Sequence, residues 1–348
     1  MLTNKQIGEI REHLEKAQNP VFFYDNDNDG LCSFLLLRRM LGRGTGIVVK
    51  NYPDLNAQYA KKAQDLNADY IFVLDKPEIA QEFLDEIGML HIPVIWIDHH
   101  DSKELKSENL ILYNPVKNKG NDKSSEPVTY LSYKIAGNTG DIWIAMIGCI
   151  SDHYLPDFAE DFSKAYPEFW GEVKMPFDAY YGTELGRVAR SLNFGLKDTP
   201  AHVKDLQNLL LGMRGPDQVL SELEGDHAFS ERYRALKEKY EILLKKAESE
   251  LDRNLLFFAY GGFECLNADL SNELSHRYKG KYVAVAYVKA GEAKISMRGK
   301  NVRAILEKLL KNFQNCRGGG HEDAVGASLQ ADDLPKFREL MENEVNKK

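Results

Sequence analysis

The stretch Val21–Gly30 reads VFFYDNDNDG and joins an apolar tetrapeptide to a dense run of carboxylates. The tetrapeptide predicts a buried strand, and the apolar run Leu31–Leu41 predicts a helix directly after the carboxylates. Asp25, Asp27 and Asp29 therefore fall on a turn between a strand and a helix. Like charges this close repel each other, so such a cluster indicates bound cations with oxygen ligands.

Two other interpretations of this stretch compete with a metal site. Asp, Asn and Gly also form ordinary solvated turns, because their side chains hydrogen-bond to the local backbone. An EF-hand calcium loop begins with the same alternation of acidic residues, but it requires an acidic ligand at its twelfth position. Leu36 occupies that position here, and a strand rather than a helix precedes the loop. The calcium-loop interpretation is therefore rejected.

Length and composition predict an ordinary globular protein of two domains. The chain of 348 residues is longer than one average domain, and its hydrophobic content of 43% is enough for substantial cores. The net charge of −8 argues against a surface that binds long nucleic acid mainly through basic patches. A phosphate substrate stays compatible with this charge, because bound metal ions reverse the sign of the local field.

Cysteine usage and hydropathy indicate where the protein works. The four cysteines are far apart and form no CxxC pair, which suits a reducing compartment and gives no zinc motif. The segment Met1–Pro20 lacks the apolar core of a signal peptide, and the most apolar run, Ile142–Ile150, is too short to span a bilayer. We therefore expect a soluble, cytoplasmic protein without a membrane partner.

Apolar strand-like runs alternate with helical patterns through the first third of the chain. The expected strands are Val21–Tyr24, Gly46–Lys50, Tyr70–Leu74, Pro93–Ile97 and Leu110–Tyr113, and the expected helices are Leu31–Leu41, Asn56–Leu66 and Pro77–Leu90. Continuous runs of Val, Ile and aromatic residues are typical of strands covered on both faces. The pattern predicts an α/β fold with a mostly parallel sheet, whose ligands collect at the carboxyl ends of its strands.

Polar side chains follow three of these strands at the predicted ligand-binding edge. Asp25–Asp29, Asp75 and Asp98–His100 each come directly after a strand, and Asp152 follows an apolar helix. Any single carboxylate among them is also explained as the cap of the next helix. Capping does not explain Asp or His at four separate element ends, so the joint pattern predicts a metal centre. His153, as a lone histidine, is left out of the metal set.

The rest of the chain predicts a connector and a second α/β module. The segment from Pro156 to Pro200 has no clear pattern apart from a helix near Thr183–Leu192. Phe229–Leu255 predicts one long charged helix between the domains. Strands and helices alternate again from Leu255 onward, and Arg317–His321 predicts a glycine-rich loop. We expect a first domain of residues 1–195, a helical linker of residues 196–254 and a second domain of residues 255–348.

The residue types suit chemistry at a phosphate. Carboxylates mixed with imidazole favour Mn²⁺ or Mg²⁺, and the acidic set is large enough for two ions. Two ions about 3.5–4 Å apart stabilise the attacking and leaving oxygens of an in-line displacement at phosphorus. Gly318, Gly319 and Gly320 can direct backbone N–H groups at a phosphate, with His321 and Arg298 as further donors. A triple glycine is also often a flexible turn, and such an arginine is also often a surface strand residue.

In this order the motifs resemble those of the DHH phosphoesterases of the RecJ type, which carry a second, DHHA1 domain. The matching segments are Asp25–Gly30, Asp75, Asp98–His100 and Asp152 for the DHH domain, and Arg298, Gly318–His321 and Ala324–Ala327 for the DHHA1 domain. The resemblance covers nearly the whole chain. It implies a catalytic, metal-binding DHH domain at residues 1–195 and a smaller, substrate-binding DHHA1 domain at residues 255–348.

The resemblance also implies a role for each site residue. It implies that Asp25, Asp27 and Asp75 hold one Mn²⁺ and that Asp29, Asp75, His99 and Asp152 hold a second, with Asp75 bridging and Mg²⁺ as a substitute. It implies that His100 contacts the scissile phosphate or assists the leaving group, while Arg298 and Gly318–His321 bind substrate. Two positions depart from the family pattern, since some relatives have His at the place of Asp25 and many have Gly at the place of Arg317.

The function implied by this resemblance is a metal-dependent exonuclease acting on the ends of single-stranded DNA or RNA, with a replication or repair helicase as a candidate partner. A phosphodiesterase or phosphatase for very short oligonucleotides or cyclic dinucleotides, of the nanoRNase type, is the alternative. Two further interpretations are disfavoured. A family II pyrophosphatase does not explain the Gly318–His321 loop, and a catalytically inactive replisome scaffold does not explain the complete set of carboxylates.

Overall fold

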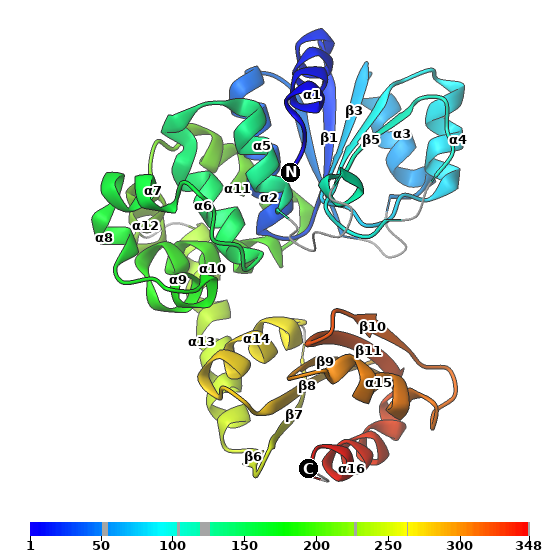
Figure 1. Ribbon diagram of the computed structural model, residues 1–348, viewed down its shortest axis with the longest axis vertical. Helices are drawn as coiled ribbons and strands as arrows, with labels where there is room; N and C mark the ends of the chain where they lie inside the picture. The colour runs from blue at the N-terminus through cyan, green and yellow to red at the C-terminus, as the bar shows by residue number, and fades with distance from the viewer. Residues whose placement is uncertain (51–54, 103–104, 119–125, 226–227, 263, 347–348) are drawn as a thin grey trace. The chain divides into compact units, whose positions relative to one another are not determined.

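The structure is a computed structural model that describes residues 1–50, 55–102, 105–118, 126–225, 228–262 and 264–346. The chain folds into two compact units, Met1–Tyr233 and Arg234–Lys348, and helix α13 (Ala228–Glu248) crosses the boundary between them (Figure 1). Within the described residues, no helix combines the length and the apolar character needed to cross a membrane.

The first unit is built on a sheet whose described strands are all parallel and follow the order β2-β1-β3-β4-β5. These strands are β1 (Pro20–Asp25), β2 (Thr45–Val49), β3 (Tyr70–Leu74), β4 (Val94–Ile97) and β5 (Leu110–Tyr113). Successive side chains of a strand point to opposite faces. Phe22 and Tyr24 accordingly pack into one core, whereas Val21 and Phe23 pack into another. The predicted α/β class with a mostly parallel sheet is confirmed.

Helices cover both faces of this sheet (Figure 1). One face carries α1 (Asn4–Lys16), α2 (Asn28–Leu41), α5 (Val128–Ala136) and α6 (Ile142–Ser151), and the other carries α3 (Ala57–Asp65) and α4 (Gln81–Met89). Two short 3₁₀ turns, η1 (Pro115–Asn118) and η2 (Thr139–Asp141), flank α5. Because both faces are covered, the strands read as continuous apolar runs rather than as an alternation.

The segment Pro156–Pro200, which has no clear sequence pattern apart from the helix near Thr183–Leu192, and the helical residues after it fold into several helices that complete the first core. They are α7 (Ala159–Ala165), α8 (Pro167–Trp170), α9 (Pro176–Gly182), α10 (Glu184–Leu196), α11 (Pro200–Gly212) and α12 (Pro216–Glu224). Four of them, α8, α9, α11 and α12, have proline in their first turn, where its missing N–H costs nothing. Helices α7 to α9 are too short to give a helical period in the sequence.

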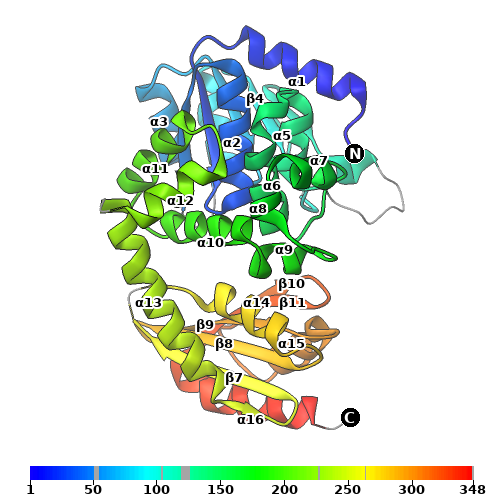
Figure 2. The same cartoon turned by 90° about the vertical axis from the view of Figure 1, so that its left-hand side faces the viewer.

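The second unit contains a mixed sheet with the order β10-β11-β9-β8-β7-β6. Its strands are β6 (Leu251–Asp252), β7 (Leu255–Gly261), β8 (Tyr282–Lys289), β9 (Glu292–Arg298), β10 (Arg317–Gly320) and β11 (Ala324–Gln330). Strands β7 and β8 are parallel, and the other described neighbours are antiparallel. Helix α14 (Asn267–Arg277) and helix α16 (Leu334–Val345) lie on opposite faces (Figure 2), and α15 (Val302–Leu310) shares the core of α16. The 3₁₀ turn η3 (Ala331–Asp333) leads into α16.

Two predictions for this part of the chain are wrong. The connector helix ends at Glu248 instead of Leu255, because Leu251–Asp252 pairs antiparallel with β7. Arg317–Gly320, predicted as a loop, is the edge strand β10 and pairs antiparallel with β11. A strand composed mainly of glycine has no apolar side chains to alternate, so its sequence reads as a loop.

Candidate functional site

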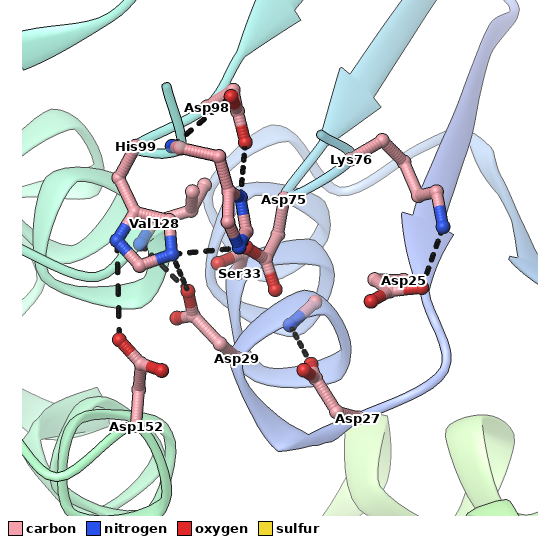
Figure 3. A network of polar contacts seen from close by, with 12 residues as sticks. Asp25, Asp27, Asp29, Ser33, Asp75, Lys76, Asp98, His99, Val128 and Asp152 are labelled. Carbon is pink, nitrogen blue, oxygen red and sulfur yellow. Dashed lines mark hydrogen bonds and ion pairs between the residues drawn. The ribbon is translucent and has the colours of Figure 1, made fainter. Parts of the chain in front are cut away.

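The six side chains predicted as metal ligands lie together at the carboxyl edge of the parallel sheet (Figure 3). His100, predicted as a catalytic residue, lies with them. They come from the end of β1 (Asp25), the start of α2 (Asp27 and Asp29), the residue after β3 (Asp75), the residues after β4 (His99 and His100) and the end of α6 (Asp152). Three groups have ligand atoms within 4.8 Å of one another, namely Asp25 with Asp27 and Asp75, Asp29 with His99 and Asp152, and Asp75 with His99 and His100. We refer to these seven residues as the metal cluster.

The turn after β1 is held by a helix cap and a glycine. Asp27 Oδ1 accepts a hydrogen bond from the Gly30 N–H at 2.9 Å, so α2 begins at Asn28 rather than at the predicted Leu31. A Cβ at position 30 would lie 2.5 Å from the carbonyl oxygen of Asp25, so only glycine lets α2 approach the end of β1 this closely. The carboxylates of Asp25 and Asp27 are thereby held next to each other.

The buried Asp29 carboxylate joins α2 to the start of α5. Its two oxygens accept hydrogen bonds from the N–H groups of Val128 and Thr129 at 2.8 and 2.7 Å, and Thr129 Oγ1 donates to the Asp29 carbonyl oxygen. These N–H groups belong to the first turn of α5, where they have no partner within the helix and favour negative charge. Asp29 Oδ2 also lies 3.9 Å from His99 Nε2, so one carboxylate serves both the helix cap and the metal cluster.

Asp75 belongs to two of the three groups and has a φ of 57°, in the left-handed region that disfavours side chains. Its side chain is 2% exposed. Oδ1 lies 3.4 Å from His99 Nε2 and 3.8 Å from His100 Nδ1, yet it accepts no hydrogen bond from the described residues. A buried carboxylate oxygen without a hydrogen bond is costly, and a bound cation would remove that cost.

Mutual repulsion in the metal cluster is reflected in its pKa values. Burial, together with the charges of Asp25 and Asp29, raises the pKa of Asp27 to about 7. Burial and the neighbouring carboxylates also raise the pKa of Asp75 well above the usual range. The pKa of Asp152 is raised in the same direction by desolvation on the side that faces the cluster and by the charges of Asp29 and Asp27, although 39% of its side chain is exposed. Without added positive charge these carboxylates retain protons, and a hard divalent cation would take the place of those protons. The donor set therefore fits such a cation, while the ligand role of each residue stays a prediction.

His100 is held by the buried carboxylate of Asp98. Asp98 Oδ1 lies 2.8 Å from His100 Nδ1, and Asp98 Oδ2 accepts a hydrogen bond from the His100 backbone N–H at 3.1 Å. Asn114 donates to the His100 carbonyl oxygen at 2.8 Å. Burial alone lowers the pKa of His100, but the hydrogen bond and charge of Asp98 outweigh it, so the pKa is raised. Asp98 thus favours the Nδ1–H form and leaves Nε2 for another partner. The sequence analysis missed Asn114, because a single Asn after β5 carries little signal.

Lys76 is a second residue of the site that the sequence analysis missed. Its side chain is 4% exposed, and its Nζ lies 2.7 Å from Asp25 Oδ1 (Figure 3). Trp96 Nε1 donates to the Lys76 carbonyl oxygen at 2.9 Å and fixes the backbone next to Asp75. A lysine is almost never buried without a charged partner, so its position directly after Asp75 was the available signal. The positive charge of Lys76 therefore lies directly next to the metal cluster.

The predicted substrate-binding residues Arg298 and His321 approach the same residue of the second unit. Arg298 ends β9 and pairs across the ladder with Ala324, and the His321 N–H donates to the Ala324 carbonyl oxygen at 2.9 Å. The guanidinium is oriented by Asn272, whose Oδ1 accepts from Arg298 Nε at 2.6 Å, and by the Met297 carbonyl oxygen at 2.7 Å from Nη1. Both predicted residues thus lie at one end of the β9-β11 ladder.

The three glycines next to them form an edge strand. Hydrogen-bonded and non-hydrogen-bonded pairs alternate along an antiparallel ladder. Because His321 and Ala324 form a hydrogen-bonded pair, the N–H groups of Gly318 and Gly320 point away from β11 toward the open edge of the sheet. The predicted set of successive donors is therefore replaced by two alternate donors on an exposed strand.

Two domain families match the sequence, and several solved structures share the fold. Residues 21–150 match the DHH family, N-terminal domain, and residues 267–347 match the DHHA1 domain. No curated protein matches the chain. RecJ from Thermus thermophilus, in complex with Mn²⁺, has a TM-score of 0.68 and 15% identity over 100% of this chain and 56% of that one. The chain thus spans little more than half the length of that RecJ.

Two other structures are similar over almost their full length. An exonuclease RecJ bound to manganese has a TM-score of 0.65 and 15% identity, over 100% of this chain and 96% of that one. The pGpG-specific phosphodiesterase PggH from Vibrio cholerae has a TM-score of 0.51 and 12% identity, over 95% and 99%. The two matched domain families together cover more than half of the 348 residues, in the order DHH then DHHA1. With a candidate Asp and His metal site at the edge of its parallel sheet, the chain belongs to the DHH/DHHA1 phosphoesterase family.

Proposed function

We propose that this phosphoesterase is a metal-dependent exonuclease that hydrolyses phosphodiester bonds at the ends of single-stranded DNA or RNA. The observation that carries the proposal is the metal cluster, in which Asp75 presents a buried oxygen without a hydrogen bond among the described residues. The two RecJ structures, one in complex with Mn²⁺ and one bound to manganese, support this reading by analogy.

The metal cluster would hold two Mn²⁺ ions, with Mg²⁺ as a substitute. Asp25, Asp27 and Asp75 would hold one ion, and these three residues form one of the groups found within 4.8 Å. Asp29, His99 and Asp152 form another of those groups and would hold the second ion, with Asp75 as a further ligand. When bound, divalent ions supply Lewis acidity at the phosphate and a more acidic water. The ions would also replace the protons that repulsion otherwise keeps on Asp27 and Asp75.

His100 is the residue we assign to the scissile phosphate or the leaving oxygen. Its Nδ1 faces Asp98, so in the protonated imidazole the Nε2–H is available to donate a proton or a hydrogen bond. The raised pKa of His100 keeps a larger fraction of the imidazole protonated near neutral pH. Asn114 and Asp98 would act as positioning residues, because they fix the backbone and the ring of His100.

The second unit would bind the negative charge of the substrate away from the reacting bond. Arg298 offers a guanidinium oriented by Asn272, and β10 offers the outward N–H groups of Gly318 and Gly320 beside His321. Charged and backbone donors of this kind bind phosphates. We therefore assign to these donors the phosphates of the strand that do not react.

A phosphodiesterase for very short oligonucleotides is the second candidate. The first unit carries 24 Lys and Arg against 36 Asp and Glu, a poor surface for long polyanions. The similarity to PggH, described as pGpG-specific, extends over nearly the whole of both chains and also supports it.

Labelled strands of graded length distinguish the two candidates. The purified protein with Mn²⁺ would be given single-stranded DNA and RNA, from dinucleotides to long strands, labelled at either end. An exonuclease shortens long strands stepwise, whereas the second candidate cleaves only the shortest ones. The Asp75→Asn variant is the control for contaminating nucleases. Absence of hydrolysis at every length in the unmodified protein would contradict both candidates.

A further inference from the structure

Next to the metal cluster, the first unit carries a column of stacked rings that no part of the proposed reaction uses. The His153 ring stacks on Phe177 with 4.0 Å between centroids and 17° between planes. Phe177 in turn stacks on Tyr181, one helical turn further along α9, at 6.2 Å and 14°. Arg190 lies over the Tyr181 ring at 5.6 Å. We call His153, Phe177 and Tyr181 the ring column.

The ring column begins one residue away from the metal cluster. His153 directly follows Asp152, whose Oδ2 lies 3.9 Å from His99 Nδ1. Consecutive Cα atoms are about 3.8 Å apart, so the column starts at the rim of the site where phosphate chemistry is proposed. The Asp152 side chain is 39% exposed, so this rim is open to solvent.

The backbone at His153 adopts the left-handed conformation that ends α6. The N–H groups of His153 and Tyr154 donate to the carbonyl oxygens of Ile150 and Cys149, the pattern that ends a helix with a left-handed residue. His153 is that residue, with a φ of 56°, and glycine is the residue that usually occupies this position. His153 thus holds a backbone conformation that is unfavourable for a residue with a side chain.

Burial of the column also differs from that of an ordinary core. Tyr180, the neighbour of Tyr181, is buried and belongs to the first core. Phe177 lies outside the three hydrophobic cores found among the described residues, and His153, Phe177 and Tyr181 are all partly exposed. Partly exposed, parallel rings next to a phosphate-processing site match the surfaces on which nucleobases stack.

We propose that the ring column is a nucleobase-stacking surface, which holds a base of the nucleotide whose phosphate lies at the metal cluster. The proposal rests on the proposed function and deepens it, since it assigns the recognition of bases to α9 and the end of α6. Stacking on rings tolerates any base, because every base has a π face. Arg190 adds positive charge next to Tyr181, the last ring of the column.

The chain contains a matched control for this proposal. His91 ends α4 with the same hydrogen bonds, from the N–H groups of His91 and Ile92 to Gly88 and Ile87, and has a φ of 55°. Helix α4 packs on the opposite face of the sheet from α6. Glycine at either position relieves the same backbone strain, so His153→Gly and His91→Gly should both raise the melting temperature.

Binding of two fluorescent probes tests the proposal without hydrolysis. Fluorescence anisotropy in EDTA would compare an oligodeoxyadenylate with an abasic strand of equal length and charge. We expect the unmodified protein and His91→Gly to prefer the strand with bases by about 5-fold to about 150-fold. We expect His153→Gly to reduce this ratio strongly, and Phe177→Ala to reduce it more than Phe177→Leu, which keeps the apolar bulk.

Three results would overturn the proposal or separate it from the proposed function. An unchanged ratio in His153→Gly, together with a raised melting temperature, would show a folded variant whose missing ring does not matter. Equal binding of both strands by the unmodified protein would also exclude a stacking surface. A base-dependent ratio without hydrolysis of any strand in Mn²⁺ would support the ring column while contradicting the exonuclease proposal.

Discussion

The two units of this chain differ in the sign of their net charge and in the groups that they expose at the edges of their sheets. Residues 1–233 carry a net charge of −12 and gather carboxylates at the end of a parallel sheet, whereas residues 234–348 carry a net charge of +4 and expose an edge strand. A parallel sheet brings the carboxyl ends of neighbouring strands together, so it concentrates side chains. An antiparallel edge strand instead exposes backbone donors. The first unit is therefore suited to holding cations, and the second unit to offering hydrogen-bond donors to anions.

The largest effect should come from Asp75→Asn, which removes the carboxylate shared by two groups of the cluster. We expect hydrolysis to fall by about 10³-fold or more, because both proposed ions would lose a ligand. The metal-free variant should nevertheless melt at a higher temperature, because a buried carboxylate with a raised pKa destabilises the fold when charged. Initial rates in Mn²⁺ and melting curves in EDTA test both expectations. Unchanged hydrolysis in Asp75→Asn would contradict the proposal that the first unit gathers its carboxylates to hold catalytic ions.

The second largest effect should come from Lys76, whose ammonium group lies next to Asp25 of the metal cluster. Lys76→Met leaves Asp25, whose side chain is 31% exposed, without this partner and should lower the free energy of unfolding in EDTA by about 1–3 kcal/mol. Because the cluster is then more negative, the rise in melting temperature on adding Mn²⁺ should be larger than in the unmodified protein. Differential scanning calorimetry with and without Mn²⁺ gives both quantities.

Lys50 provides the matched control for this experiment. It follows β2 at the same edge of the sheet, but its Nζ donates to the carbonyl oxygens of Leu196 and Asp198 rather than to a carboxylate. Lys50→Met should therefore reduce stability without changing the increment from Mn²⁺. A larger increment in both variants would contradict a specific role for Lys76.

Repulsion among the carboxylates of the metal cluster should also make the stability of the fold depend on pH, and we expect this effect to be smaller. The pKa of Asp27 is raised to about 7 in the folded protein, from an unfolded value of about 3.9. The folded state thus binds more protons than the unfolded state, and stability is lost as the pH rises from about 4 through about 7. We expect the melting temperature in EDTA to fall by several degrees over this range, and saturating Mn²⁺ to reverse the loss at neutral pH. A melting temperature that rises over this range in EDTA would contradict the repulsion within the cluster.

The site residues that could be predicted from the sequence are those that directly follow an apolar run of the chain. Asp25, Asp75 and Asp98–His100 follow apolar runs, and parallel strands bring such ends together, so their proximity could be inferred without coordinates. The sequence also allowed the exclusion of an EF-hand, because Leu36 stands where an acidic ligand is required. The apolar runs and the alternation of strands with helices are local or regular properties, which is why they can be derived from the sequence.

The missed features depend on contacts between distant residues. The pairing of Asp29 with Val128 and Thr129 joins positions about a hundred residues apart, so no local pattern indicates that this acid also caps α5. His153 reads as a lone histidine, and only its left-handed backbone and its stacking on Phe177 suggest a use. Burial and backbone strain arise from tertiary packing, which composition and spacing do not report.

We expect the smallest effects from alanine substitutions at Gly319 and Gly320 in the second unit. A Cβ on Gly319 would meet no atom within 4 Å, whereas a Cβ on Gly320, with a φ of 139°, would lie 2.5 Å from the Ala324 carbonyl oxygen. Gly320→Ala should thus lower the free energy of unfolding by about 1–3 kcal/mol, and Gly319→Ala by no more than about 0.5 kcal/mol. Gly319→Ala should still weaken substrate binding several-fold if a phosphate approaches the bare backbone of β10. Chemical denaturation and substrate affinity, measured on both variants, separate these effects. Unaltered affinity in the stable Gly319→Ala variant would mean that the second unit binds anions through Arg298 and His321 rather than through its glycine edge.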